Sequence, residues 1–295
     1  MKQLFIPLLV FIVNTVSAQQ FSTNYDPHPL WSPVFYTSPG TISRAATGEP
    51  NTGYWQNKAD YEINASFNEA STSITGTVKI TYRNNSPHAL LFLWLQLDQN
   101  LFNKSSRGAA KLPVEGRSRY GDAASTFNGG YTIKSVRLSE NNKPADYIIN
   151  DTRMQIRLPK AMKPGGDVIN IVIDYSYPIA EYQADRAGIL KTKNGDVYAV
   201  AQWYPRMCVF DDVEGWNTLP YLGAGEFYLE YGDFDFTITT PGNYLVVASG
   251  ELQNPLEVLS AKDRERLAQA KQSDKTIMIR NEQEMKTNMV AAASP

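Results

Sequence analysis

The sequence predicts an all-β protein in which antiparallel strands form a sandwich or a set of open sheets. Two observations indicate this class. Apolar and polar residues alternate in several segments, which is the period of a strand with one buried and one solvated face. Short loops rich in Asn, Pro and Gly separate these segments, as in a sandwich or an open barrel. Strands do not alternate with helices, so a parallel α/β sheet is not expected.

Strands are expected from about residue 55 onward. Segments 61–67 and 74–82 alternate and are joined by a short connection, which predicts an antiparallel hairpin. Segment 90–97 is almost continuously apolar, which is typical of a strand buried on both faces. Further strands are expected at 131–138, 147–150, 154–158, 168–177, 234–240, 244–250 and 275–280.

Two other segments depart from the strand pattern. Segment 103–130 is polar, rich in glycine and punctuated by basic residues. We expect a solvated insertion there, with a functional loop as the alternative, because loops of this length are unusual inside a domain. Residues 261–272 are rich in helix formers, and Ser260 with Asp263 forms a capping box, so we expect one short helix near 261–272.

The first 18 residues have the pattern of a signal peptide. Lys2 supplies a positive charge, residues 4–13 form a short apolar core, and residues 16–18 fit a cleavage site. The apolar core is too short to span a membrane comfortably, so we expect a secreted or periplasmic protein without stable membrane insertion after cleavage. Residues 19–53 carry many prolines and no sustained period, which predicts an irregular N-terminal arm before a β domain over 54–295.

Composition excludes some classes of function. The chain has 295 residues, 42% of them hydrophobic, which is enough for a large β domain with a substantial core. A net charge of −2 offers no footprint for a polyanion, so no nucleic acid partner is expected. Cys208 is the one cysteine, so no internal disulfide can form, and we expect its thiol to be buried as a small apolar group.

The residues alone do not indicate a reaction. The sequence contains no HExxH, GxSxG, Walker or dinucleotide-binding motif. His28 and His88 lie next to prolines without a partner at metal-ligand spacing, so we expect both to be surface turn residues. A cation site stays open as an alternative to a solvated acidic loop, and a pair of glycosidase carboxylates stays open among the scattered acids of the chain. That loop contains Asp211, Asp212, Glu214 and Glu226.

Residues 198–235 are unusually rich in aromatic side chains. Trp203 and Trp216 lie here together with several tyrosines. Buried aromatic residues contribute a large apolar area, and Trp and Tyr also need a polar partner. We therefore expect this segment to pack against another surface, which can lie outside the chain.

Several segments, in order, resemble one known family. They are YWQNKADYEI (54–63), ITG (74–76), YRNNSP (82–87), residues 93–102, AQWYPRMCVFDDVEGW (201–216), GAGEFYLEYGDFDFTITTPGNYLVVASGEL (223–252) and VAAASP (290–295). Together they resemble the N-terminal domain in bacterial members of the alanyl aminopeptidase and leukotriene-A hydrolase family, the gluzincin zinc metallopeptidases. The resemblance spans residues 54–295.

The resemblance implies a saddle-like β domain followed directly by a thermolysin-like zinc domain. In this family the HExxH motif with its distant Glu, and the GxMEN-type loop that binds the substrate's amine, belong to that following domain. None of them is present here. The chain alone is therefore expected to hold no catalytic residue and no zinc and to be inactive, whereas a full-length parent would be a zinc metallo-aminopeptidase.

The resemblance also implies a substrate-binding loop. In the family, a loop of the N-terminal domain reaches the active site with a Gln, followed two residues later by an acid or an amide. Gln202 matches the first position, whereas Tyr204 departs from the pattern at the second. Gln202 is thus expected to help hold the amino terminus of a peptide, and Tyr204 to stack against a substrate side chain. The alternative is that both residues only pack a domain interface.

Two functional hypotheses follow. In the first, the chain is an N-terminal domain, a fragment of a secreted zinc aminopeptidase-like protein, and shapes the cleft for peptide N-termini. Its partners would be the missing C-terminal catalytic domain and, in the parent, a peptide substrate. In the second, it is a freestanding secreted β-sandwich binding module for a glycan or a protein, with Trp203 and Trp216 as candidate contacts.

Overall fold

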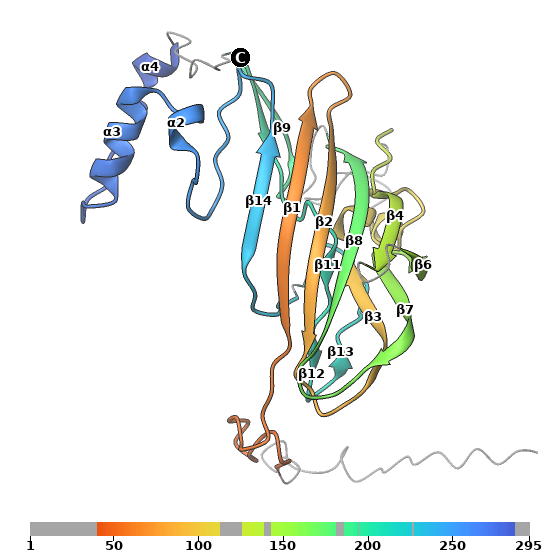
Figure 1. Ribbon diagram of the computed structural model, residues 1–295. Coiled ribbons are helices and arrows are strands. Elements are labelled where there is room, and N and C mark those ends of the chain that lie inside the picture. Colours follow the sequence, from red (N-terminus) through yellow and green to blue (C-terminus); the bar gives the residue numbers. More distant parts are fainter. Residues whose placement is uncertain are drawn as a thin grey trace, which may run out of the picture. The chain divides into compact units, whose positions relative to one another are not determined.

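The structure is a computed structural model, and its described residues are mostly strands (Figure 1). The predicted all-β class, with mostly antiparallel sheets, is thereby confirmed. The chain divides into two units between Gly53 and Tyr54, and each is described by itself. The predicted signal peptide and most of the predicted arm lie outside the described part. The described residues are 40–112, 126–138, 143–180, 186–193, 195–225 and 227–286.

The described part of the first unit, residues 40–53, is a closed loop without a helix or an extended strand. Backbone hydrogen bonds tie it to itself, from the Asn51 N–H to the Ser43 carbonyl and from the Gly53 N–H to the Ile42 carbonyl, both at 2.9 Å. An isolated antiparallel bridge joins Arg44 to Pro50. These local bonds satisfy the backbone where no sheet is available to do so.

The larger sheet of the second unit has six strands in the order β14-β1-β2-β8-β4-β5. The predicted hairpin is present as β1 and β2, which pair antiparallel from Lys58↔Arg83 to Asn68↔Ser73. All neighbours are antiparallel except β14, which runs parallel to β1 (Figure 1). The strands are β1 (Lys58–Asn68), β2 (Ser73–Asn84), β4 (Thr132–Leu138), β5 (Lys143–Pro144), β8 (Asp167–Pro178) and β14 (Phe234–Thr239).

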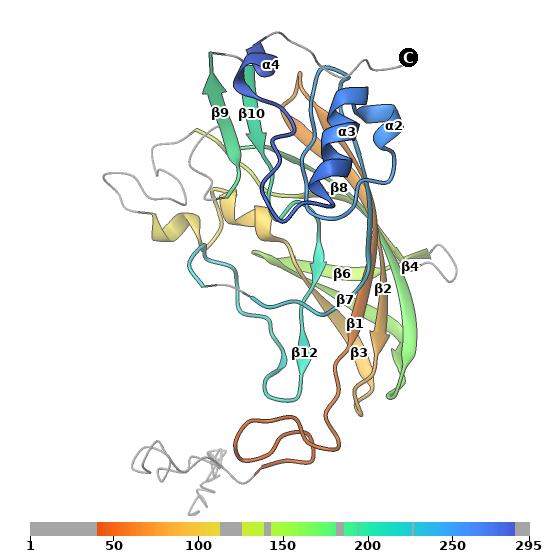
Figure 2. The same cartoon turned by 90° about the vertical axis from the view of Figure 1, so that its left-hand side faces the viewer.

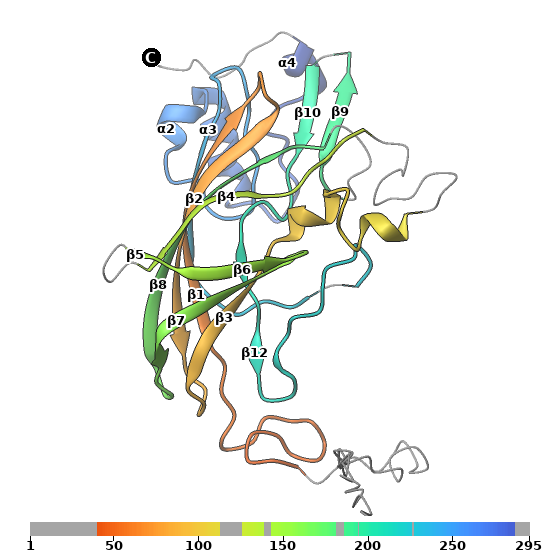
Figure 3. The same ribbon diagram turned by 90° about the vertical axis from the view of Figure 1, so that its right-hand side faces the viewer.

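A second sheet has four strands in the order β11-β3-β7-β6, all of them antiparallel. The buried faces of both sheets contribute to one hydrophobic cluster, in which Val78 and Ile173 of the first sheet join Leu93 and Ile156 of the second. Figure 3 shows the two layers from the side. The strands of this sheet are β3 (Leu90–Gln96), β6 (Asp146–Asn150), β7 (Arg153–Met162) and β11 (Arg206–Met207).

Strand β3 corrects one expectation. Its apolar run predicted burial on both faces, and Leu93 and Leu95 are fully buried, but Leu91 is 65% exposed. The pairing with β7 is irregular between Leu90 and Phe92. A local irregularity of this kind re-aims side chains, so continuous apolarity alone did not reveal which residues face the core.

Short elements lie between the strands of the two sheets and within the aromatic segment. The ladders β9–β10 and β12–β13 are hairpins, and the 3₁₀ helix η1 follows directly after β3. The bounds of these elements are η1 (Asp98–Phe102), η2 (Ala109–Lys111), β9 (Gly188–Thr192), β10 (Gly195–Ala199), β12 (Phe210–Asp211) and β13 (Gly215–Trp216).

The last described part of the chain is helical (Figure 2). The predicted helix is present as α3 (Ala261–Ala270), and the Ser260 hydroxyl accepts a hydrogen bond from the Asp263 N–H as its N-cap. Two shorter helices, α2 (Pro255–Val258) and α4 (Glu282–Lys286), accompany it. None of the helices in the described chain has the length and apolar content needed to span a bilayer.

Two expected strands are absent. Segment 275–280 is held by side chains instead of a ladder: Arg280 pairs with Asp263, and Arg266 donates to the Ile279 carbonyl at 2.7 Å. Segment 244–250 contains no strand, and Val247 is 85% exposed. Both segments have the composition of strands, but strand formation also needs a neighbouring strand to pair with, which composition does not supply.

Candidate functional site

Gln202 lies in the loop between β10 and β11, and its backbone adopts an uncommon conformation. Its φ of 52° is in the left-handed region, which few non-glycine residues occupy. Two side chains hold its carbonyl oxygen: the Tyr131 hydroxyl donates to it at 2.8 Å and Gln99 Nε2 at 3.2 Å. Gln99 Nε2 also donates to the Ala201 carbonyl at 2.8 Å. Such backbone strain persists where surrounding contacts over-determine it, and it concentrates at functional sites.

The Gln202 side chain, unlike its backbone carbonyl, is not held by hydrogen bonds within the described part of the chain. It is half-buried, and its amide makes no hydrogen bond to any described residue. The clamped carbonyl fixes the position of Cα, and with it the direction in which the side chain leaves the loop. Gln202 therefore presents a hydrogen-bonding amide from a rigid support, whereas its role toward a peptide stays a prediction.

Tyr204 is built into an aromatic cluster. Its ring packs edge-on against Tyr61 at a centroid distance of 5.4 Å, Trp203 at 5.1 Å and Phe234 at 6.2 Å. Burial raises the pKa of the Tyr204 hydroxyl above its ordinary value. The ring thus contacts residues of its own domain on several sides. This contact set fits the packing alternative and leaves stacking against a substrate as a prediction.

An ion pair fixes the far end of the same loop. Arg206 Nε lies 2.8 Å from Asp98 Oδ2, and Arg206 Nη2 lies 2.9 Å from Asp98 Oδ1, so the pair is bidentate. The Asp98 side chain is fully buried and that of Arg206 is 13% exposed. Burial raises the pKa of the Asp98 carboxyl, and the opposing effect of Arg206 only partly offsets this. The pair joins η1 to β11, so neighbouring residues of η1 hold the loop at Gln202 and at Arg206.

Sequence reasoning missed the residues that hold the loop. Asp98 and Gln99 are 108 and 103 residues away from their partners Arg206 and Gln202, so no local pattern links them. One signal was available. A pair of polar residues directly after the nearly continuous apolar segment 90–97 implies buried polar groups, and buried polar groups need partners.

The predicted acidic loop does not come together around a single point. Asp211 Oδ1 instead accepts the N–H groups of Val213 at 3.0 Å and Glu214 at 2.7 Å, which closes the turn between β12 and β13. Burial would raise the pKa of Asp211, but hydrogen bonds from Tyr228, Glu214 and Asn217 bring it below its ordinary value. Glu226 lies outside the described residues. The described chain contains no group of three or more His, Cys, Asp and Glu side chains placed to hold a metal.

The structure also shows the burial and contacts of the remaining candidate residues. Cys208 is 2% exposed, and burial raises its thiol pKa, which confirms the expectation of a buried apolar group. His88 is an exposed turn residue, as expected, and contacts Phe210 edge-on. Trp203 and Trp216 are half-buried and contact other rings of the domain, so no observation specifically favours a glycan-binding surface.

Glu230 has a strongly shifted carboxyl and gives a testable pH dependence. Burial raises its pKa from 4.5 to about 7, although the Phe210 N–H donates to it at 3.2 Å. The folded state therefore holds this proton more tightly than the unfolded chain. Its contribution to stability is present at low pH and is lost as the pH rises from 4.5 through about 7.

We expect Glu230→Gln to unfold with a higher free energy than the parent at pH 8, by about 1–2 kcal/mol. The difference should shrink as the pH approaches 4.5. Urea unfolding at a series of pH values measures it, with the exposed Glu214→Gln as matched control. A constant difference between variant and parent across this range would show that the Glu230 carboxyl does not titrate as proposed.

Exposed apolar residues accumulate from Tyr228 onward, at the end of the aromatic segment and beyond it. Tyr231 is 77% and Val247 85% exposed. Large exposed apolar areas commonly mark interaction surfaces. The other members in this part of the chain are Tyr228, Leu229, Phe234, Leu245, Val246 and Leu252.

Comparisons with known proteins found no matching family model and no matching curated protein. A two-domain M1 zinc metallopeptidase bound to L-tryptophan overlaps this chain with a TM-score of 0.35 and 12% identity, over 70% of this chain and 39% of that chain. The M1 zinc metallopeptidase from Deinococcus radiodurans gives a TM-score of 0.32 and 11% identity, over 69% and 38%. Leukotriene A4 hydrolase from Saccharomyces cerevisiae gives 0.33 and 13%, over 63% and 24%. The chain thus spans about two fifths or less of these proteins, and an overlap this loose carries no functional conclusion.

Proposed function

We propose that this chain is the N-terminal domain of a secreted or periplasmic zinc aminopeptidase-like protein. In that protein it would form one side of the active-site cleft and contact the amino terminus of a peptide. The ordered sequence resemblance over residues 54–295 supports the proposal, as does the antiparallel β fold. The observation that carries it is Gln202, whose backbone is clamped by Tyr131 and Gln99 while its amide makes no hydrogen bond to the described chain.

The chemistry of this arrangement suits a cationic amine. The side-chain oxygen of Gln202 is a neutral acceptor, and an ammonium group supplies three donors. A support that is rigid before the ligand arrives reduces the ordering that binding requires. Tyr204 offers no second carboxylate or amide, so this domain would contribute a single side-chain acceptor to the amine. The remaining acceptors would come from the catalytic domain.

The proposed enzyme would hold zinc on residues of the following domain. Such a zinc ion would polarise the peptide carbonyl and activate water. The present chain has no HExxH motif, and its own contribution would be to position the peptide and close one side of the cleft. The exposed apolar residues after position 228 would then pack against the catalytic domain.

The first test is to sequence the coding DNA downstream of the codon for Pro295. A frame that continues into HExxH and a helix bearing a Glu supports the proposal. A stop codon directly after Pro295 contradicts it, because no cleft could then be formed by this polypeptide.

In the longer protein, we expect Gln202→Ala to raise the KM for peptides with a free amino terminus about tenfold, which corresponds to the loss of one hydrogen bond to a charged group. Gln202→Glu should retain amine binding, because a carboxylate also accepts from ammonium. The matched control is Val200→Ala, an exposed position of the same loop. Steady-state kinetics with free peptides measure the effect, and N-acetylated peptides are assayed as competitive inhibitors. Equal changes in the KM of the free peptide and in the inhibition constant of the N-acetylated peptide would exclude the proposed contact.

A further inference from the structure

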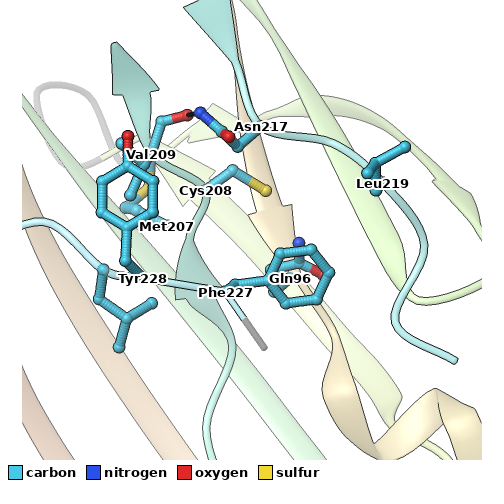
Figure 4. A pocket seen from close by; sticks show the side chains of 9 residues that line it. Gln96, Met207, Cys208, Val209, Asn217, Leu219, Phe227 and Tyr228 are labelled. Carbon is cyan, nitrogen blue, oxygen red and sulfur yellow. Dashed lines mark hydrogen bonds between the residues drawn. The ribbon is translucent and has the colours of Figure 1, made fainter. Parts of the chain in front are cut away.

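A pocket of about 180 Å³ lies beside β3 and β11, and neither Gln202 nor Tyr204 lines it (Figure 4). Gln96, the last residue of β3, forms part of its wall together with Cys208 and Asn217. The rest of the wall is apolar, including Leu219 and Phe227, except for Tyr228, whose hydroxyl donates to Asp211. None of the residues that line it carries a formal charge at neutral pH. Its volume compares with the roughly 150 Å³ of an apolar cavity that accommodates one benzene molecule.

Gln96 makes this pocket unusual. Its side chain is 1% exposed, and neither Nε2 nor Oε1 has a hydrogen-bond partner among the described residues. Buried amides are almost always paired, because an unpaired donor and acceptor forfeit the hydrogen bonds that water would give them. Both atoms belong to a residue of the pocket wall, but each exposes less than 1 Å², so a ligand pairs with them when the Gln96 amide turns toward the pocket.

Other polar groups in the wall use part of their hydrogen-bonding capacity within the protein. Asn217 Nδ2 donates to Asp211 Oδ2 at 2.9 Å and to the Val209 carbonyl at 3.3 Å, which leaves the Asn217 side-chain oxygen without a hydrogen bond among the described residues. Burial raises the Cys208 thiol pKa, so the sulfur stays protonated and uncharged. Figure 4 shows the Gln96 amide, the Cys208 sulfur and the Asn217 side chain around the same hollow.

We propose that this pocket binds a small neutral ring that carries a cis-amide edge. In a cis amide the N–H and C=O groups lie side by side, so they pair reciprocally with the Oε1 acceptor and the Nε2 donor of Gln96. The apolar part of the ring would contact Phe227 and Leu219. An ionised ligand is disfavoured, because no opposite charge in the wall would offset its desolvation.

The probe is 2-piperidone, a six-membered lactam, and its control is N-methyl-2-piperidone, which has the same ring but no N–H. The full chain is titrated with each compound while the side-chain NH₂ signals of its glutamines are followed by NMR. We expect 2-piperidone to shift one NH₂ pair saturably, with a dissociation constant of about the millimolar range for a ligand of this size. The N-methyl compound should bind about tenfold more weakly.

Two variants test the assignment. Gln96→Leu should abolish the preference for the N–H compound and remove the responding NH₂ signal. Leu219→Trp places a large ring at a position that is 76% exposed, so it should block binding without disturbing the core. The proposal is overturned by equal binding of both lactams, by a preference that survives in Gln96→Leu, or by the absence of any saturable shift, which would mean that the pocket holds water only.

Discussion

Asp98→Ala is expected to lower the free energy of unfolding by about 3–5 kcal/mol, one of the two largest effects expected for a single substitution in this chain. The Asp98 carboxylate is fully buried and accepts two hydrogen bonds from Arg206. Its removal leaves a guanidinium group that is 13% exposed without its counter-charge. Equilibrium unfolding in urea, followed by tryptophan fluorescence, measures the loss.

The double variant Asp98→Ala/Arg206→Met separates the unpaired charge from the loss of packing. It should recover much of the stability, because replacing both members of a buried pair by apolar groups is often nearly neutral. If the double variant is no more stable than Asp98→Ala, the loss of stability does not come from the unpaired Arg206 guanidinium group. A loss below about 1 kcal/mol in the single variant would place the pair among weakly contributing surface bridges.

Gly232→Ala is expected to detach β14 from the large sheet. A Cβ atom at this position would lie 1.7 Å from the Ala59 carbonyl oxygen and 2.5 Å from its carbonyl carbon. Both are backbone atoms of β1 that no rotamer change can move away. We expect a loss of about 3 kcal/mol or more, since overpacking against backbone forces the strands apart.

Hydrogen exchange locates this effect. The Tyr61 N–H donates to the Asp233 carbonyl at 2.9 Å across the β1–β14 pair, so this amide should lose protection in Gly232→Ala. Amides between β2 and β8 should keep more of theirs. The control is Thr237→Ala, an exposed position on β14. Unchanged protection at Tyr61 would mean that the strand pair tolerates the added methyl group.

Sequence reasoning predicted well those parts of the fold that depend on neighbouring residues. The β1–β2 hairpin follows from alternation and a short turn, and helix α3 follows from its capping residue. The parallel pairing of β14 with β1 was not predictable in this way, because no feature of residues 234–239 identifies a partner strand so distant in the chain. Segments 244–250 and 275–280 show the converse, since strand-like composition did not produce a strand.

In the candidate site, too, local sequence features were predictable and contacts between distant segments were not. Gln202 and Tyr204 were found through resemblance to a family motif, and the motif alone does not show how they are held. The left-handed backbone of Gln202 and its clamp by Tyr131 and Gln99 arise from contacts between distant segments. Gln96 was missed for a different reason. A single amide at the end of an apolar strand looks like an ordinary strand end until its surroundings show that nothing satisfies it.

The pairing of β14 with β1 also constrains the order in which the domain can fold. Lys58 and Asp233, which meet at the start of this pair, are 175 residues apart in the chain. Closing so long a loop is entropically unfavourable, and native contacts of high sequence separation slow folding. During synthesis, β1 and β2 emerge long before β14, so the β1 edge stays unpaired until most of the domain has left the ribosome. Until β14 is in place, the β1 edge is open to pairing with another chain, so the half-made domain is prone to aggregation.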